Sequence, residues 1–212
     1  MVQVFFGKIR SYDDLGLILT NAEITAPEPK RSIVTVPGRD GSLDLSAVLS
    51  GDVKFENRQL KLTFTMKDYR QRWLRDFSYI YNQIHGKNFH IVVDNDPEYY
   101  WEGFCSVDKS ESSYNKGVIT VICDVYPYKH KAREISVTST SSGISLKCLS
   151  GREAVCPSVT TSGNITFTCN NKSVSLSAGT WKKQEIVFRE GINNVSITGN
   201  ATVKIAYVEG IL

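Results

Sequence analysis

Three carboxylates lie close together in the first half of the chain, at Asp94, Asp96 and Glu98. A group of this kind is typical of a calcium loop or of the carboxylate pair of a glycosidase. An EF-hand loop, however, needs a central glycine and a terminal glutamate that this stretch lacks. Paired catalytic carboxylates normally come from different strands that face one cleft. Because Asp94-Asn95-Asp96-Pro97 is typical turn sequence, we favour a hairpin turn with solvated carboxylates.

Two histidines, His85 and His90, could be combined with Cys105 or Cys123 as a zinc site. No pair of these residues has the close spacing of a structural zinc site. His85 is instead well placed to neutralise the negative end of a helix that finishes beside it. The sequence therefore predicts no metal centre.

Other catalytic patterns are also missing from the sequence. There is no Gly-x-Ser-x-Gly motif, and only three histidines are present to act as a general base. Gly38-Arg39-Asp40-Gly41 lacks the lysine that follows the glycines of a phosphate-binding loop, so a solvated turn is the simpler interpretation. We expect no enzymatic activity and no cofactor.

The five cysteines favour buried free thiols over disulfides or metal ligands. They are odd in number, share no Cys-x-x-Cys spacing and lie mostly in strand-like runs: Cys105, Cys123, Cys148, Cys156 and Cys169. The N-terminus has neither a basic lead nor a small-residue cleavage site, so we expect no Sec export and a reducing folding compartment. A bridge between Cys156 and Cys169 remains the alternative. No apolar run is long enough to predict membrane insertion.

One segment, Lys67 to His85, has apolar residues at helical spacing. Asp68 can cap its first turn, and Gly86 can adopt the left-handed conformation that ends it. A single amphipathic helix in a chain of alternating segments must cover a sheet. Its predicted buried face consists of Tyr69, Trp73, Phe77, Ile80, Tyr81 and Ile84.

Strands and turns account for the rest of the first half. Leu60, Leu62, Phe64 and Met66 alternate with polar residues, which predicts a half-buried strand. A hairpin is predicted where residues 89–93 and 99–104 flank the carboxylate-rich turn. The sequence around Pro127 ends a last strand, and we place the domain boundary after residue 132. Two short strands are expected within residues 1–25, one before and one after the Asp13-Asp14 turn, and further strands in residues 33–35 and 118–125.

Residues 133–212 are predicted to form a second, all-β domain. Ser, Thr, Asn and Gly become frequent there, and no helical period survives. The short, evenly spaced strands are typical of a two-sheet sandwich of jelly-roll type. The expected fold class is thus mainly β with one helix. The strands expected are 135–137, 144–146, 158–160, 165–169, 173–176, 183–188, 194–198 and 203–207.

Five stretches occur in one order through the first half. They are Val36-Pro37-Gly38-Arg39-Asp40-Gly41, Phe55-Glu56-Asn57-Arg58, the helix closing on His85-Gly86, residues 94–103, and Val125-Tyr126-Pro127-Tyr128-Lys129. This order resembles the N-terminal pattern of the distal tail proteins of long-tailed phages that infect mainly Gram-positive bacteria. The second half, with Gly191-Ile192-Asn193-Asn194, is similar to that family's C-terminal galectin-like or carbohydrate-module-like sandwich.

The resemblance implies an N-terminal β-rich ring-forming domain and a structural role in the virion tail tip, after assembly in the host cytoplasm. It implies a homo-hexamer that contacts the tail tube protein and the tail-associated lysin or hub protein, and that can hold a receptor-binding protein. DNA would pass through the ring without specific binding, which suits the balance of acidic and basic residues over residues 1–132. Predicted subunit-interface residues are Arg39, Asp40, Arg58, Tyr99, Tyr100 and Trp101.

Aromatic residues leave an alternative open. Tyr99, Tyr100, Trp101 and Phe104 could stack on nucleotides or sugars, although alternate residues of a strand face the core, which favours packing in the core or at a subunit interface. In the second domain, Trp181 or Tyr207 could stack on a cell-wall sugar. The alternative function is therefore a carbohydrate-binding module, and burial of these rings is the competing interpretation.

Overall fold

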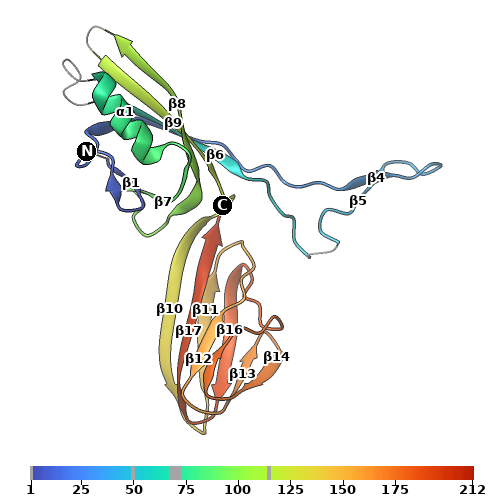
Figure 1. Cartoon of the computed structure of the whole chain (residues 1–212). Coiled ribbons are helices and arrows are strands. Elements are labelled where there is room, and N and C mark those ends of the chain that lie inside the picture. The colour runs from blue at the N-terminus through green and yellow to red at the C-terminus, as the bar shows by residue number, and fades with distance from the viewer. Residues whose placement is uncertain (1, 49–50, 67–72, 114–115) are drawn as a thin grey trace. The chain divides into compact units, whose positions relative to one another are not determined.

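The computed structural model describes residues 2–48, 51–66, 73–113 and 116–212. The chain divides into two compact units, Met1–Pro127 and Tyr128–Leu212 (Figure 1). The boundary expected after residue 132 falls inside strand β10 (Lys129–Ser139), which pairs with β17 (Ala201–Ile211) from Lys129 onward. Pro127 cannot donate to a strand ladder, so the last strand of the first unit ends before it.

The first unit contains a seven-stranded antiparallel sheet in the order β2-β1-β7-β8-β9-β6-β3. Its strands are β1 (Val4–Phe6), β2 (Ile9–Arg10), β3 (Leu17–Ile24), β6 (Arg58–Met66), β7 (Lys87–Val93), β8 (Trp101–Ser113) and β9 (Lys116–Val125). The predicted hairpin is confirmed, because β7 pairs with β8 across the turn that contains Asp94 and Asp96.

Side-chain alternation along β6 builds the core of this unit. Leu60, Leu62, Phe64 and Met66 are all buried, as the period-two pattern predicts. The ring of Phe64 lies 6.3 Å from that of Phe6 on β1, although three strands separate β1 from β6 in the sheet order. The sheet therefore curves strongly around one hydrophobic core.

Helix α1 (Trp73–Ile84) packs on this core with the predicted face. Ile80 and Ile84 are buried, and Phe77 and Tyr81 pack against the core at its margin. Gly86 has a φ of 75°, the left-handed conformation expected at the helix end. The predicted start of the helix, residues 67–72 with the Asp68 cap, lies outside the described residues, and so does the side chain of Trp73.

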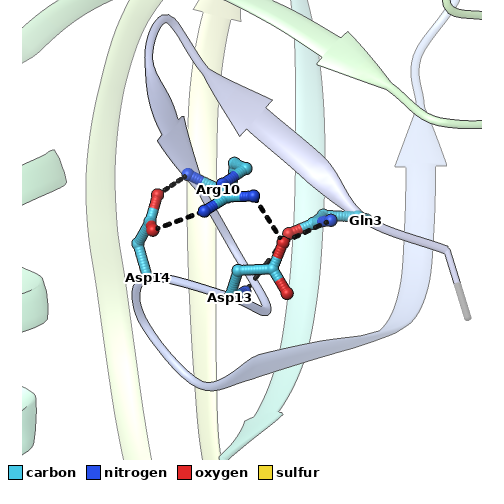
Figure 2. A network of polar contacts seen from close by, with 4 residues as sticks. All are labelled: Gln3, Arg10, Asp13 and Asp14. Carbon is cyan, nitrogen blue, oxygen red and sulfur yellow. Dashed lines mark hydrogen bonds and ion pairs between the residues drawn. The ribbon is translucent and has the colours of Figure 1, made fainter.

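A network of polar contacts lies at one edge of the sheet, beside the two-residue strand β2 (Figure 2). Arg10 forms ion pairs with Asp13 at 3.0 Å and Asp14 at 3.3 Å, and Gln3 accepts a hydrogen bond from the Asp13 amide. Hydrogen bonds from the Arg10 amide and guanidinium lower the pKa of Asp14, while Asp14 raises the pKa of Arg10. A very short, charged edge strand resists pairing with another sheet.

Residues 25–48 and 51–57 belong to a long arm between β3 and β6, drawn in Figure 1 as a thin ribbon with strands β4 (Ile33–Thr35) and β5 (Ser42–Asp44). Strand β4 lies where it is expected, and β5 falls in the turn-rich stretch that follows. The two strands pair antiparallel, and Pro29 bridges Phe55 closer to the sheet. The arm is thus an extended two-stranded ribbon.

The second unit consists of two four-stranded antiparallel sheets in the orders β10-β17-β12-β15 and β11-β16-β13-β14. Side chains from both sheets share one core, as the sandwich prediction requires. The remaining strands are β11 (Ile144–Ser150), β12 (Ser158–Thr161), β13 (Ile165–Cys169), β14 (Lys172–Leu176), β15 (Gly179–Trp181) and β16 (Gly191–Thr198).

One strand prediction in this unit is wrong. Residues 183–188 form no strand; only Phe188 makes an isolated bridge, to Val155. Strand β15 lies just before this segment instead. The apolar residues Ile186 and Phe188 are buried in the sandwich core, so they satisfy an alternating pattern without joining a ladder.

All five cysteines are free thiols in the structure. Cys156 donates a hydrogen bond to the carbonyl of Lys183 at 3.0 Å, and Cys169 is buried in the sandwich core. The alternative bridge between Cys156 and Cys169 is therefore not formed.

Candidate interaction surfaces

The arm carries apolar side chains that its own unit does not cover. Ile33 is 49% exposed, Val34 43%, Leu45 40% and Val48 67%. Water contact by four large aliphatic groups on one ribbon is unfavourable, because each would gain about half of the 1.5–3 kcal/mol that full burial gives a fully exposed side chain. Several exposed apolar residues on one segment make the arm a candidate surface for a partner.

A polar contact set keeps part of this arm ordered without a core of its own. Asp44 accepts hydrogen bonds from the Ser46 amide at 3.0 Å and from Arg31 at 3.1 Å. The Ser46 hydroxyl also donates to Asp44 and accepts from the Ser32 amide. These bonds, led by the Ser46 hydroxyl, lower the pKa of Asp44 to about 2. The Asp44 contact set therefore joins the two sides of the arm.

The tip of the arm holds two of the predicted interface residues. Arg39 and Asp40 are exposed between Gly38 and Gly41, whose φ angles are 82° and 73°. The positive φ values show why glycine is needed at both positions. The tip is a solvated turn, as expected, and both charged side chains are available to a partner.

Two other predicted interface residues are inside the first unit. Trp101 and Arg58 are both more than nine-tenths buried, and the guanidinium carbon of Arg58 lies 5.9 Å from the centre of the Trp101 ring. Burial lowers the pKa of Arg58. Strand alternation explains the burial of Trp101, because Trp101, Cys105 and Val107 all lie on the core side of β8. Neither Arg58 nor Trp101 presents a surface to a second subunit.

The aromatic residues around the hairpin turn stay partly accessible. Tyr100 stacks on His90 with 4.6 Å between ring centres, and His90 lies 3.8 Å from Glu102. Tyr99 is half-buried, and its amide donates to Asp96 within the turn. Together with exposed Phe104, these rings form the accessible part of the predicted aromatic surface.

His85 does not act as the predicted cation at the helix end. Its Nδ1 accepts a hydrogen bond from the Val107 amide at 3.1 Å, so that nitrogen carries no proton. Its Nε2 lies 3.0 Å from the Tyr81 hydroxyl, and the two rings stack at 4.1 Å. His85 therefore joins the helix end to β8 through its two ring nitrogens.

The two candidate sugar-stacking residues differ. Tyr207 is buried, packs edge-on against Phe188 at 5.0 Å and donates a hydrogen bond to the Leu149 carbonyl at 2.6 Å. It has no free ring face, which removes it from the predicted site. Trp181 is half-exposed, donates to the Ser177 carbonyl at 2.8 Å and lies 5.0 Å from the Lys183 ammonium.

A hollow of about 550 Å³, lined by both polar residues and the apolar Leu146 and Val195, lies on the sheet that contains β11, β16 and β13. At its corner, the buried Asn193 amide accepts from Asn170 at 2.9 Å and donates to the Arg189 carbonyl at 2.8 Å. Sequence reasoning missed this hollow, because its residues look like ordinary outward-facing polar positions. Its lining includes Ser145, Lys147, Thr168, Asn170, Asn171 and Asn194.

Within the described part of the chain, no group of three or more His, Cys, Asp or Glu residues is arranged to hold a metal ion. Over the same residues, no helix has the length and apolar character to span a bilayer.

Comparison with known proteins gives a match in structure. No protein-family model and no curated protein sequence matches this chain. Among solved structures, its fold is similar to that of Dit (gp 19.1) from phage SPP1, with a TM-score of 0.69 over 100% of both chains and 13% sequence identity. That protein is described as a paradigm of the hub adsorption apparatus in Gram-positive infecting phages. The chain therefore has a Dit-like fold, which confirms the predicted resemblance at the level of the fold.

Proposed function

We propose that this chain is a structural hub of a phage tail tip, where it forms a hexameric ring through its first unit. The main support is the arm, which exposes the apolar side chains of Ile33, Val34, Leu45 and Val48. The Dit-like fold, which extends over the full length of the chain, also supports this proposal. An arm of this composition loses free energy in water and gains it against a neighbour. The proposed role is scaffolding, without catalysis.

The two edges of the seven-stranded sheet support head-to-tail association. At one edge, β2 has two residues and is flanked by the ion pairs of Arg10. At the other, β3 has eight residues, most of them exposed, and no described strand pairs with its outer side. The β2 edge resists pairing, so the open β3 edge would contact a different surface of the next chain; such a contact is heterologous and closes a ring when the rotation between subunits permits. A permanent contact of this type buries on the order of 2,000 Å².

The proposed ring occupies the tail tip of the virion after assembly in the host cytoplasm. One face contacts the tail tube protein and the other contacts the tail-associated lysin or hub protein. The sandwich units carry a receptor-binding protein. DNA crosses the ring without specific binding, since equal numbers of acidic and basic residues over residues 1–132 provide no net attraction for phosphates.

The arm can be tested with a double variant, Val34→Ser and Val48→Ser, which keeps both side chains small and removes apolar surface. We expect each ring contact to weaken by about 2 kcal/mol. Light scattering at micromolar concentration should then show smaller species than the native chain, while the melting temperatures of both units stay unchanged.

The matched control is Ile192→Ser, because Ile192 is 61% exposed but belongs to the second unit. This variant should assemble like the native chain. Equal loss of assembly in both variants would contradict the arm's role, as would full assembly of the double variant.

Carbohydrate binding by the second unit is the alternative function. The observation that favours it is the hollow on the sheet that contains β11, β16 and β13. Amide and hydroxyl groups beside one lysine, Lys147, are suited to a polyhydroxylated ligand. Retention of the isolated chain on purified cell-wall polymer, lost in Lys147→Ala together with Asn194→Ala, would support this function. A chain that assembles but is not retained supports the hub alone.

A further inference from the structure

Two cysteines that no proposed function uses face each other in the middle of the first unit's sheet. Cys105 on β8 and Cys123 on β9 are register partners, and their Sγ atoms are 2.8 Å apart. Two unbonded sulfur atoms at that distance are closer than their van der Waals radii allow, while a disulfide bond needs about 2.0 Å. We propose that Cys105 and Cys123 are an oxidisable thiol pair that a small peroxide closes to a cross-strand disulfide.

The hydrogen-bond pattern places Cys105 and Cys123 at a non-hydrogen-bonded position of the ladder, where opposed residues are closest and a disulfide can form. In an antiparallel ladder, opposed residues alternate between hydrogen-bonded pairs and closer pairs without hydrogen bonds. The Tyr126 amide donates to the Glu102 carbonyl at 2.9 Å, so this opposed pair is a hydrogen-bonded one. Counting along the register, Cys105 and Cys123 form a non-hydrogen-bonded pair. Their Cα atoms are then about 4.5 Å apart, which lies within the range of disulfides.

A neighbouring glycine confirms how closely these two strands approach. Gly103 on β8 lies opposite Val125 on β9, and these two residues form the next non-hydrogen-bonded pair after Cys105 and Cys123. A Cβ atom built on Gly103 would lie 2.6 Å from the Val125 Cα and 2.2 Å from the Asp124 carbonyl oxygen. Only glycine fits such an approach, so close contact between β8 and β9 is a fixed feature of the sheet here.

The surroundings of the pair determine which oxidant can reach it. Both side chains have no exposed surface. The hydrogen bond with the neighbouring Cys105 thiol, together with burial, raises the pKa of Cys123 well above its ordinary value. The thiolate is therefore scarce, so oxidation of the pair is slow, and a bulky disulfide reagent cannot enter without opening the core. A small peroxide is the class of oxidant that fits.

The reaction takes two electrons from the pair. The sulfur of one cysteine attacks hydrogen peroxide, the O–O bond breaks, and the products are a sulfenic acid and water. The second thiol then attacks the sulfenic sulfur, the S–S bond forms, and the hydroxyl leaves with the thiol proton as a second water. In total, two thiols and one hydrogen peroxide give one disulfide and two waters. This inference does not depend on the ring.

The test starts from the fully reduced native chain, which is treated with hydrogen peroxide, denatured and alkylated. Untreated protein should label at all five cysteines. Treated protein should lose labelling at two of them, and peptide mapping should find Cys105 linked to Cys123. Thiol reductant should restore both labels.

Two variants serve as matched controls. Cys148→Ala removes another buried thiol, from the second unit, and should leave the peroxide-induced link intact. Cys123→Ala should abolish the link while Cys105 stays present. If Cys123→Ala fails to fold, the mapping of the native chain still decides the question. Five labelled thiols after treatment, or a disulfide mapped to any other pair, would overturn the proposal.

Discussion

The two units of this chain use their strands differently. In the second unit every strand, from β10 to β17, contributes a side chain to the sandwich core or packs one against it. In the first unit, none of the described residues between 20 and 57 belongs to the core, so the arm strands β4 and β5 contribute nothing to the core of the unit that carries them. A segment that stays ordered without a core of its own is suited to contact with another molecule.

The largest effect that can test this comparison is loss of a core aromatic residue. Phe64→Ala should destabilise the first unit by about 3–5 kcal/mol, since the ring is fully buried. Phe167→Ala is the matched change in the second unit, with an equally buried ring. Calorimetry should show each variant lowering one of two transitions. If both variants lower both transitions, the units are not independent.

A smaller effect is expected at the buried amide of the second unit. Asn193 hydrogen bonds to Asn170, the Arg189 amide and carbonyl, and the Cys148 carbonyl. Asn193→Ala leaves several of these groups unpaired and should cost about 2–4 kcal/mol in urea unfolding. Asn194→Ala, next in sequence but exposed, should change stability by no more than about 0.5 kcal/mol. Equal costs would show that the amide network does not hold the sandwich corner.

The smallest effect concerns order in the arm. The pKa of Asp44 is lowered in the folded arm. The stabilisation of the arm by the ionised Asp44 carboxylate is therefore complete above the ordinary pKa of Asp, about 4, and is lost as the pH falls through about 2. At neutral pH, Asp44→Asn should speed hydrogen exchange at the Ser46 amide without changing either unit's melting temperature.

Asp40→Asn at the arm tip is the control for this measurement, because it removes a charge of the same kind outside the Asp44 contact set. It should leave exchange at Ser46 unchanged. Equal acceleration by both substitutions would indicate a general charge effect on the arm.

Local patterns predicted much of the fold. The alternation through Leu60, Leu62 and Phe64, the buried helix positions Ile80 and Ile84, and the strand Ile165–Cys169 are all observed. Each depends on spacing within one segment, which the sequence states directly. The strand predicted at 183–188 is wrong because buried residues can alternate without a hydrogen-bonded neighbour.

The candidate surfaces were harder to predict because they depend on contacts between distant segments. Arg58 is charged, yet its register beside Val125 and its contact with Trp101 place it in the core. The burial of Tyr207 depends on Phe188 and Leu149, each far away in sequence. The closeness of Cys105 and Cys123 follows from the register of β8 and β9, which no local motif specifies.

The central claim is that the first unit closes a ring of identical chains. Electron microscopy of the purified native chain at micromolar concentration tests it most directly. The proposal predicts closed annular particles with six-fold symmetry and peripheral lobes. A uniform population of single two-lobed particles under the same conditions would contradict it.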